Sequence, residues 1–299
     1  MAAIEVQGLA KTYGDLRAVD GVDLEVAEGE FFGLLGPNGA GKTTTLEMIE
    51  GLRRPDAGTV RVLGEEVWPR NEALLPRVGV QLQASAFFER LTAREQLRTF
   101  AALYGVDRAE ADRWLEEVGL EDKAGTRVED LSGGQAQRLS IACALVHDPE
   151  LVFLDEPTAA LDPQARRNLW DLLSGLNDSG RTVVLTTHYM DEAEVLCDRV
   201  AIIDAGRILE CDSPAALVRT LDAPARVSVA PGQLDVGTAR GLAGVDDVVE
   251  SHDGLVLTTR TPGPVLARLA ELDHLDGVRV QTGTLEDVFL SLTGREYRA

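Results

Sequence analysis

The sequence predicts an α/β fold with a mixed sheet arranged around a phosphate-binding loop, and three observations support this. Residues 36–43 read Gly-Pro-Asn-Gly-Ala-Gly-Lys-Thr, which fits the pattern GxxxxGK[ST]. A buried strand is predicted before this loop at residues 30–35, and a helix is predicted after it at residues 44–52. Further short apolar strands are predicted at residues 77–83, 151–154 and 182–187.

The loop pattern has a direct physical basis. Glycines let the main chain curl close to an anion, and the following helix points its unpaired N–H groups and positive dipole end at the same charge. Lys42 is expected to reach the outer phosphates of a nucleotide, and the Thr43 hydroxyl is expected to hold Mg²⁺. The alternative, a plain glycine turn between core elements, is disfavoured by the strand–loop–helix setting. The candidate nucleotide-binding residues here are Gly36, Pro37, Asn38, Gly39, Ala40, Gly41, Lys42, Thr43 and Thr44.

The composition argues against several classes of protein. In 299 residues, 50 acidic and 29 basic side chains give a formal net charge of −21, which disfavours a nucleic-acid partner. No apolar run approaches the ~18–20 residues that a membrane helix needs, so we expect no direct membrane insertion. Cys143, Cys197 and Cys211 lack the spacing of metal ligands and suggest reduced thiols in a cytosol.

An antiparallel β region is predicted around the phosphate loop. Residues 4–9, 19–26 and 59–63 alternate apolar and polar side chains, as half-buried strands do. A hairpin is predicted near the end of the same domain, at residues 200–209. These elements predict a first domain that spans residues 1–220.

A helical subdomain is predicted within that domain, at about residues 84–146. The spacing of apolar residues changes there to a helical period, and a separate helix is predicted at residues 136–146. One apolar face is predicted to contain Leu91, Leu97, Phe100, Leu103, Trp114, Leu115 and Val118.

Residues 221–299 are predicted to form a small α+β domain of their own. The expected order of elements is βαββαβ, which matches a ferredoxin-like sandwich. A closing helix is predicted at residues 284–292, with Thr284 and Asp287 placed as a capping box.

An acidic pair, Asp155 and Glu156, follows the predicted strand at residues 151–154. Ligands of open α/β sheets bind at the carboxyl ends of strands, and side chains alternate in direction at a strand end. Asp155 is therefore expected in the Mg²⁺ shell, and Glu156 is expected to face the γ-phosphate and position the attacking water. A lone acidic pair would more often mark a surface turn, but the phosphate loop upstream favours the metal and water roles.

Two ring side chains are further candidates for this site. His188 ends the predicted strand at residues 182–187, where an imidazole could donate to the γ-phosphate and sense its loss. The alternative is a core histidine with its hydrogen bonds satisfied. Tyr13 precedes the loop, where its ring could stack on adenine, although its position alone favours an ordinary surface or core tyrosine.

Residues 131–135, Leu-Ser-Gly-Gly-Gln, form a second candidate anion-binding turn before a helix. Together with the motifs above, this pentapeptide resembles the signature of the ATP-binding-cassette (ABC) ATPases, and the resemblance covers about residues 4–220. It implies a family signature at Ser132, Gly133, Gly134 and Gln135, a dimer contact at Asp162, and adenine stacking at Tyr13. It also implies catalytic residues Glu156, His188, Gln83 and Lys42, and a metal site at Thr43, Gln83 and Asp155.

The identity of the glutamine stays open at this point. Gln81 and Gln83 both end the predicted strand at residues 77–83, and spacing from the strand favours Gln83. By the resemblance, this glutamine links Mg²⁺ and the attacking water to the helical subdomain.

The resemblance also implies partners. Two cassettes are expected to clasp two ATP molecules head-to-tail, as a homodimer in which each copy's signature meets the other copy's phosphate loop. The segments 188–193 and 285–295 are similar to the ATPase subunits of daunorubicin-resistance-type exporters, whose integral membrane permease is a separate chain. The expected location is cytoplasmic, peripheral on the inner face of the cell membrane. Phe87 and Phe88 could dock a permease helix or pack within the helical subdomain.

Three other functions compete with that of an exporter subunit. A soluble ABC ATPase without a permease would typically carry a long coiled coil or two cassettes, and the chain has neither a long heptad run nor a second phosphate loop. The second alternative is an importer-type cassette. Export is preferred to import only because of the resemblance to exporter subunits. The third alternative, a P-loop kinase, is disfavoured by the signature pentapeptide and by the separate domain predicted at residues 221–299.

Overall fold

A computed structural model describes residues 1–82, 87–159, 161–178, 180–221 and 224–294. The described chain divides into two compact units, one ending at Pro214 and the other beginning at Ala215. This boundary precedes the expected one at residue 220, because the short helix α7 (Pro214–Thr220) falls mostly in the second unit.

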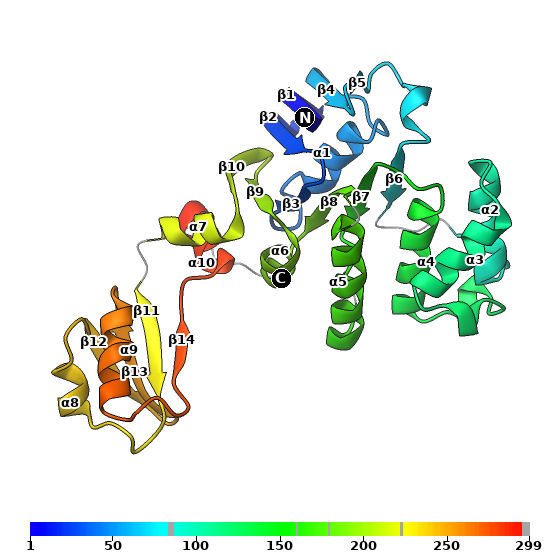
Figure 1. The fold of residues 1–299 in the computed structure, drawn as a ribbon. Helices are drawn as coiled ribbons and strands as arrows, with labels where there is room; N and C mark the ends of the chain where they lie inside the picture. The colour runs from blue at the N-terminus through cyan, green and yellow to red at the C-terminus, as the bar shows by residue number, and fades with distance from the viewer. Residues whose placement is uncertain (83–86, 160, 179, 222–223, 295–299) are drawn as a thin grey trace. The chain divides into compact units, whose positions relative to one another are not determined.

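The first unit begins with the antiparallel sheet that alternation predicts. Its strand order is β2-β1-β4-β5 (Figure 1), and inward-facing residues such as Ile4 and Val6 are buried. The first two strands are longer than predicted because they pair along nearly their whole length, with several register shifts. The strands are β1 (Ala2–Tyr13), β2 (Leu16–Ala27), β4 (Ala57–Val62) and β5 (Glu65–Glu66).

A second, mainly parallel sheet forms the centre of the first unit. Its order is β10-β9-β3-β8-β7-β6, in which β10 pairs antiparallel with β9 and the other neighbours are parallel. Every residue of its three central strands is buried, as expected for strands covered on both faces. The strands are β3 (Phe31–Leu35), β6 (Val78–Gln81), β7 (Leu151–Asp155), β8 (Thr182–Thr187), β9 (Arg199–Asp204) and β10 (Arg207–Asp212).

Helix α1 joins the two sheets into one core. It contacts β1, β2 and β4 of the first sheet and β7 and β8 of the second. Its buried Leu46, Met48 and Ile49 belong to the same hydrophobic cluster as residues of both sheets. Helix α6 was not predicted, since its seven residues are too few to show a helical period. The helices are α1 (Lys42–Ile49), α5 (Pro163–Asp178) and α6 (Met190–Leu196).

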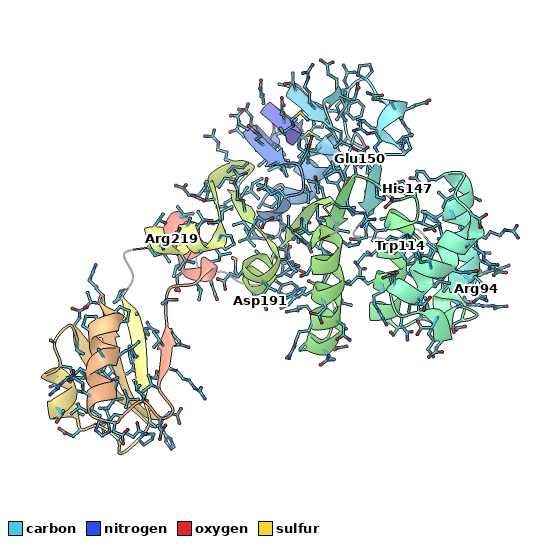
Figure 2. All side chains as sticks on the ribbon, in the orientation of Figure 1. Arg94, Trp114, His147, Glu150, Asp191 and Arg219 are labelled. Carbon is cyan, nitrogen blue, oxygen red and sulfur yellow. The ribbon has the colours of Figure 1, made fainter. Side chains whose placement is uncertain are left out.

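Three helices form the helical subdomain, and α2 packs against both α3 and α4. Figure 2 labels Arg94 and Trp114 in this region; Trp114 is buried, and Arg94 lies 3.2 Å from Asp112 in an ion pair between α2 and α3. The prediction that Leu103 lies on the apolar face is wrong: this last residue of α2 is 74% exposed, because the chain turns away after it. The helices are α2 (Ala93–Leu103), α3 (Arg108–Glu117) and α4 (Gly133–Leu145).

The second unit has the predicted βαββαβ order and then the closing helix. Its sheet is antiparallel in the order β12-β13-β11-β14, and α8 and α9 supply Ala239, Val265 and Leu269 to its core. The capping box between Thr284 and Asp287 is present. The elements are β11 (Ala225–Val229), α8 (Val236–Arg240), β12 (Asp247–Ser251), β13 (Gly254–Thr259), α9 (Pro262–Glu271), β14 (Arg279–Gln281) and α10 (Leu285–Thr293).

Short 3₁₀ turns at Glu72–Leu74, Glu121–Lys123 and Val128–Asp130 connect the longer elements of the first unit. In the described part of the chain, none of the helices is both long and apolar enough to cross a bilayer.

The packing of α1 between the sheets generates a stability prediction. Replacing Leu46, which is 1% exposed, by alanine should lower the free energy of unfolding by about 2–5 kcal/mol, because it removes buried methyl groups and leaves a cavity. Urea unfolding followed by circular dichroism measures the change. The matched control, Leu103→Ala at a 74% exposed site, should change the free energy by less than about 0.5 kcal/mol.

Candidate nucleotide-binding site

The phosphate loop connects β3 to α1, and two of its glycines have no room for a side chain. A Cβ atom at Gly36 would lie 2.2 Å from the carbonyl oxygen of Ile203 in β9. A Cβ atom at Gly41 would lie 2.4 Å from the carbonyl oxygen of Ala18 in β2, and Gly41 also has a φ of +103°. Among the described residues, no side chain caps the N-terminus of α1, so its first N–H groups suit an anion.

Lys42 begins α1, two residues earlier than predicted, and its side chain turns back into the loop. Its Nζ donates to the carbonyl oxygens of Gly36 at 2.9 Å and Pro37 at 3.3 Å. The ammonium also lies 3.2 Å from Oε1 of Glu156, and both side chains are buried. A buried charge needs such partners, so the loop and the acidic pair together hold the lysine in place.

Asp155 ends β7 and faces the start of α1. The Thr43 hydroxyl donates to its Oδ1 at 3.4 Å, and the Thr186 hydroxyl in β8 donates to the same oxygen. Burial raises the pKa of Asp155, while these hydroxyl hydrogen bonds act in the opposite direction. Sequence reasoning missed Thr186; its place in the buried strand next to β7, two residues before His188, is the signal that would have found it.

Glu156 points elsewhere, as alternation at the strand end predicts. Its backbone has a φ of +48°, and its N–H is bonded to the Thr186 hydroxyl at 3.0 Å. Its carboxylate lies between Lys42 and His188, with Oε2 at 3.3 Å from Nδ1 of the histidine. A left-handed conformation at a residue with a side chain costs on the order of 1–3 kcal/mol and is typical of functional sites.

The acids and hydroxyls suit Mg²⁺. This ion prefers oxygen ligands and is commonly held by one or two carboxylates together with substrate phosphates. Thr43 and Asp155 supply a hydroxyl and a carboxylate from adjacent positions. Within the described ranges, no cluster of three or more His, Cys, Asp and Glu side chains forms a metal cage made of protein alone.

The pentapeptide lies at a different place in the same unit. Ser132 caps α4 in a capping box with Gln135, so the helix begins at Gly133, three residues earlier than predicted. A cavity of about 330 Å³ is lined by Ser132 to Gln135 and by Asp162. Asp162 caps the start of α5 by accepting the N–H groups of residues 164 and 165, each at 2.9 Å.

Tyr13 is not brought to the acidic pair by any contact among the described residues. Tyr13 ends β1 and is 39% exposed, and the cations of Lys11 and Arg53 lie 5.8 and 5.4 Å from its ring centroid. Gln83 lies outside the described residues. Gln81, the alternative, is buried, and its Nε2 donates to the carbonyl oxygen of Leu82 at 2.6 Å.

A glycine-lined loop at a helix start, a buried lysine and an acidic pair at the end of β7 define a nucleotide-binding domain of the P-loop class. The family model "ABC transporter" matches residues 19–159. The chain is 43% identical to Nod factor export ATP-binding protein I of Paraburkholderia xenovorans (strain LB400), over 99% of this chain and 98% of that protein. It is 41% identical to the protein of the same name from Cupriavidus metallidurans, over 99% of each chain.

Solved structures that resemble this chain are also ATP-binding cassettes. An ATP-binding subunit of an ABC transporter is 31% identical, with a TM-score of 0.66, and the match covers 73% of this chain and 92% of that one. A dimeric ATP-binding cassette in a post-hydrolysis state, bound to ADP and Pi, is 30% identical, with a TM-score of 0.64 over 70% and 98% of the two chains. The chain belongs to the ABC transporter family, as an ATP-binding subunit with the ABC ATPase fold.

The close approach at Gly41 predicts that Gly41→Ala weakens ATP binding by roughly tenfold or more, because the new methyl group must displace the Ala18 carbonyl group and with it the loop. Titration with a fluorescent ATP analogue measures the affinity. Gly175→Ala is the control, since a Cβ atom there meets nothing within 4 Å, and it should leave the affinity unchanged.

Proposed function

We propose that two copies of this chain clasp ATP between them and use its hydrolysis to power export through a separate permease chain. The observation that carries the proposal is the division of candidate residues between two places. The loop, Lys42 and the acidic pair meet at one place, whereas Ser132 to Gln135 line another cavity with Asp162. A head-to-tail pair of copies brings the two halves together twice.

In each site, Lys42 binds the outer phosphates, and Tyr13 stacks on the adenine. Thr43, Asp155 and Gln83 hold Mg²⁺, which neutralises charge on the phosphates. Phosphoryl transfer is accelerated mainly by positioning the reacting groups and by stabilising the charge on the phosphates. The buried Lys42 ammonium contributes to both.

Glu156 orients the attacking water. In the described structure its carboxylate lies against the Lys42 ammonium and His188. Phosphate oxygens compete for the same ammonium, so ATP binding releases the carboxylate to accept a proton of water. His188 donates to the γ-phosphate and responds to its loss.

The partner copy completes the site. The Ser132 hydroxyl and the Gly134 N–H of one copy donate to the γ-phosphate held by the other, and Asp162 lies at the contact between copies. Hydrolysis removes this link and lets the copies separate.

Export through an integral permease rests on the relatives, which are named as export ATP-binding proteins. The partner is then a separate membrane chain, and the subunit works on the cytoplasmic face of the cell membrane. The likeness of segments 188–193 and 285–295 to daunorubicin-resistance-type exporters stays a prediction, as does the ferredoxin-like assignment of residues 221–299. Phe88, which is 58% exposed, is available for a permease helix.

Glu156→Gln should trap an ATP-bound dimer, because the amide cannot activate water while Lys42 and the signature still hold the γ-phosphate. Size-exclusion chromatography with ATP should show a dimer for this variant and a monomer without nucleotide. Adding Lys42→Ala to the same chain should abolish the dimer. A Glu156→Gln profile that stays monomeric with ATP contradicts the proposed clasp.

Mixing two inactive variants tests whether the site is shared. Lys42→Ala and Ser132→Arg should each abolish turnover, yet a mixed dimer carries one site with both residues intact. An equimolar mixture should recover about a quarter of wild-type ATPase activity, because half of the dimers are mixed and each has one working site. No recovery would show that each chain makes its site alone.

A further inference from the structure

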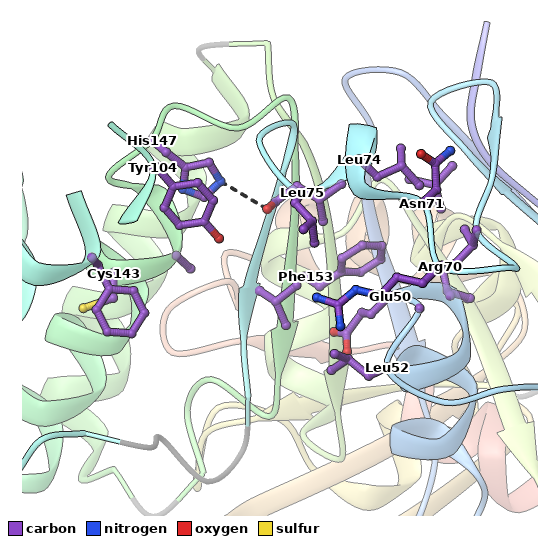
Figure 3. Close-up of a pocket in the computed structure, with 18 residues that line it drawn as sticks. Glu50, Leu52, Arg70, Asn71, Leu74, Leu75, Tyr104, Cys143, His147 and Phe153 are labelled. Atoms are coloured by element: carbon purple, nitrogen blue, oxygen red, sulfur yellow. Dashed lines mark hydrogen bonds between the residues drawn. The ribbon is translucent and has the colours of Figure 1, made fainter. Parts of the chain in front are cut away.

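Two glutamates with buried carboxylates lie outside the phosphate-binding site, and their surroundings differ. Glu50, the residue after α1, lines a mainly apolar cavity of about 320 Å³ (Figure 3), and neither of its carboxylate oxygens has a hydrogen-bond partner among the described residues. Glu192 in α6 is fully buried, but polar groups from three other segments surround its carboxylate. A buried charge is stable only where such groups stay in place, so Glu192 ties these segments together.

The neighbours of the Glu192 carboxylate favour its charged form. The indole Nε1 of Trp170 in α5 donates to Oε1 of Glu192 at 3.1 Å. Burial raises the pKa of Glu192, and four neighbours act in the opposite direction by stabilising the carboxylate. These neighbours are Thr187 at the end of β8, Thr158 in the loop after β7, and Trp170 and Arg166 in α5.

Two of these segments carry residues of the candidate catalytic site. Thr187 immediately precedes His188, and its hydroxyl also accepts the backbone N–H of Tyr189 at 2.9 Å. Thr158 lies two residues after Glu156, in the loop that follows β7. Glu192 is therefore in contact with both segments that form the pair between His188 and Glu156.

Arg166 makes a second contact between α5 and the histidine segment. Its guanidinium lies 3.9 Å from the centroid of the Tyr189 ring, and the centroid of that ring lies 4.1 Å from that of His188. The same guanidinium lies 3.9 Å from the carboxylate of Asp191 at the start of α6 (Figure 2). Helix α5 thus contacts the residues around His188 through Arg166 as well as through the bond from Trp170 to Glu192.

The contact between Glu192 and the loop after β7 is incomplete. The Thr158 hydroxyl and Oε2 of Glu192 are both buried, and neither has a hydrogen-bond partner within the described part of the chain. Unpaired buried polar atoms are costly, so a small movement of either segment that joins these two atoms is favourable. The position of the histidine segment is thereby linked to the position of the loop that begins at Glu156.

We infer that Glu192 is a positioning residue for ATP hydrolysis, whose carboxylate holds the segment of His188 against α5 and against the loop after β7. The inference rests on the proposed function, in which His188 donates to the γ-phosphate. Glu192 is fully buried and acts on the reaction through His188. Loss of its contacts lowers kcat and leaves ATP affinity nearly unchanged, because Lys42 and the phosphate loop do not depend on them.

The first test removes the donor to Glu192 and keeps an aromatic ring in α5. Trp170→Phe should lower kcat about tenfold, as expected for one lost hydrogen bond to a charged group, and should change the Kd for ATP by less than about twofold. Steady-state ATPase assays and titration with a fluorescent ATP analogue measure the two quantities. Trp114→Phe is the matched control, since Nε1 of Trp114 has no hydrogen-bond partner among the described residues, and its kcat should stay within about twofold of the wild type.

The second test asks whether the effect passes through His188. His188→Ala alone should lower turnover by about 100-fold. In that background Trp170→Phe should cost less than about twofold, because the side chain that Glu192 positions is already absent. Thr158→Val, which removes the hydroxyl from the loop, should cost about threefold in the wild type and likewise have no further effect in His188→Ala.

The outcomes of this cycle separate the inference from the proposed function. If His188→Ala leaves turnover unchanged, the role proposed for His188 fails and the inference fails with it. If His188→Ala has its expected effect but Trp170→Phe costs the same factor in both backgrounds, Glu192 is merely structural and only the inference is overturned. An unchanged kcat in Trp170→Phe overturns it as well.

A spectroscopic measurement checks the contact itself. The indole N–H resonance of Trp170 in ¹⁵N-labelled protein is assigned from its loss in Trp170→Phe. Glu192→Gln keeps the shape but removes the charge, and it should move this resonance upfield because a neutral acceptor makes a weaker hydrogen bond. Glu194→Gln, at an exposed position of the same helix, should not move it. A Trp170 resonance that is unchanged in Glu192→Gln contradicts the inference.

Discussion

The contact between the Lys42 ammonium and the Glu156 carboxylate is the interaction on which the site depends. Both charges are buried, and neither is tolerable alone in an apolar core. Two carbonyl groups of the loop accept hydrogen bonds from the ammonium, and His188 lies 3.3 Å from the carboxylate. The loop, the end of β7 and the end of β8 are therefore held at fixed positions relative to one another, by charge as well as by the backbone of the parallel sheet.

Most of the first unit follows from local sequence. The loop needs glycine at positions where any side chain would strike a carbonyl group, and Gly36 and Gly41 are such positions. The buried strands read as short apolar runs because helices cover both faces of the sheet. The different directions of Asp155 and Glu156 follow from alternation at a strand end, and the structure places them accordingly.

Other features could not be read from the sequence because they depend on contacts between distant segments. Thr186 is an ordinary strand residue until β7 and β8 lie side by side, when it bonds to both Asp155 and the backbone of Glu156. Glu50 looks like a solvated helix-end residue, and only the folded chain buries its carboxylate. Helix α6 is too short to show a period, and Leu103 fits its helix pattern but lies where α2 ends.

The two glycines of the loop that have no room for a side chain lie against different sheets, and this has a mechanical consequence. Gly36 lies against Ile203 in the parallel sheet, whereas Gly41 lies against Ala18 in the antiparallel sheet. The loop thus contacts both sheets, so its conformation depends on how the two sheets are aligned. Any ligand or partner that shifts one sheet relative to the other must change how the loop binds phosphate. Nucleotide affinity therefore reports how the two sheets are aligned.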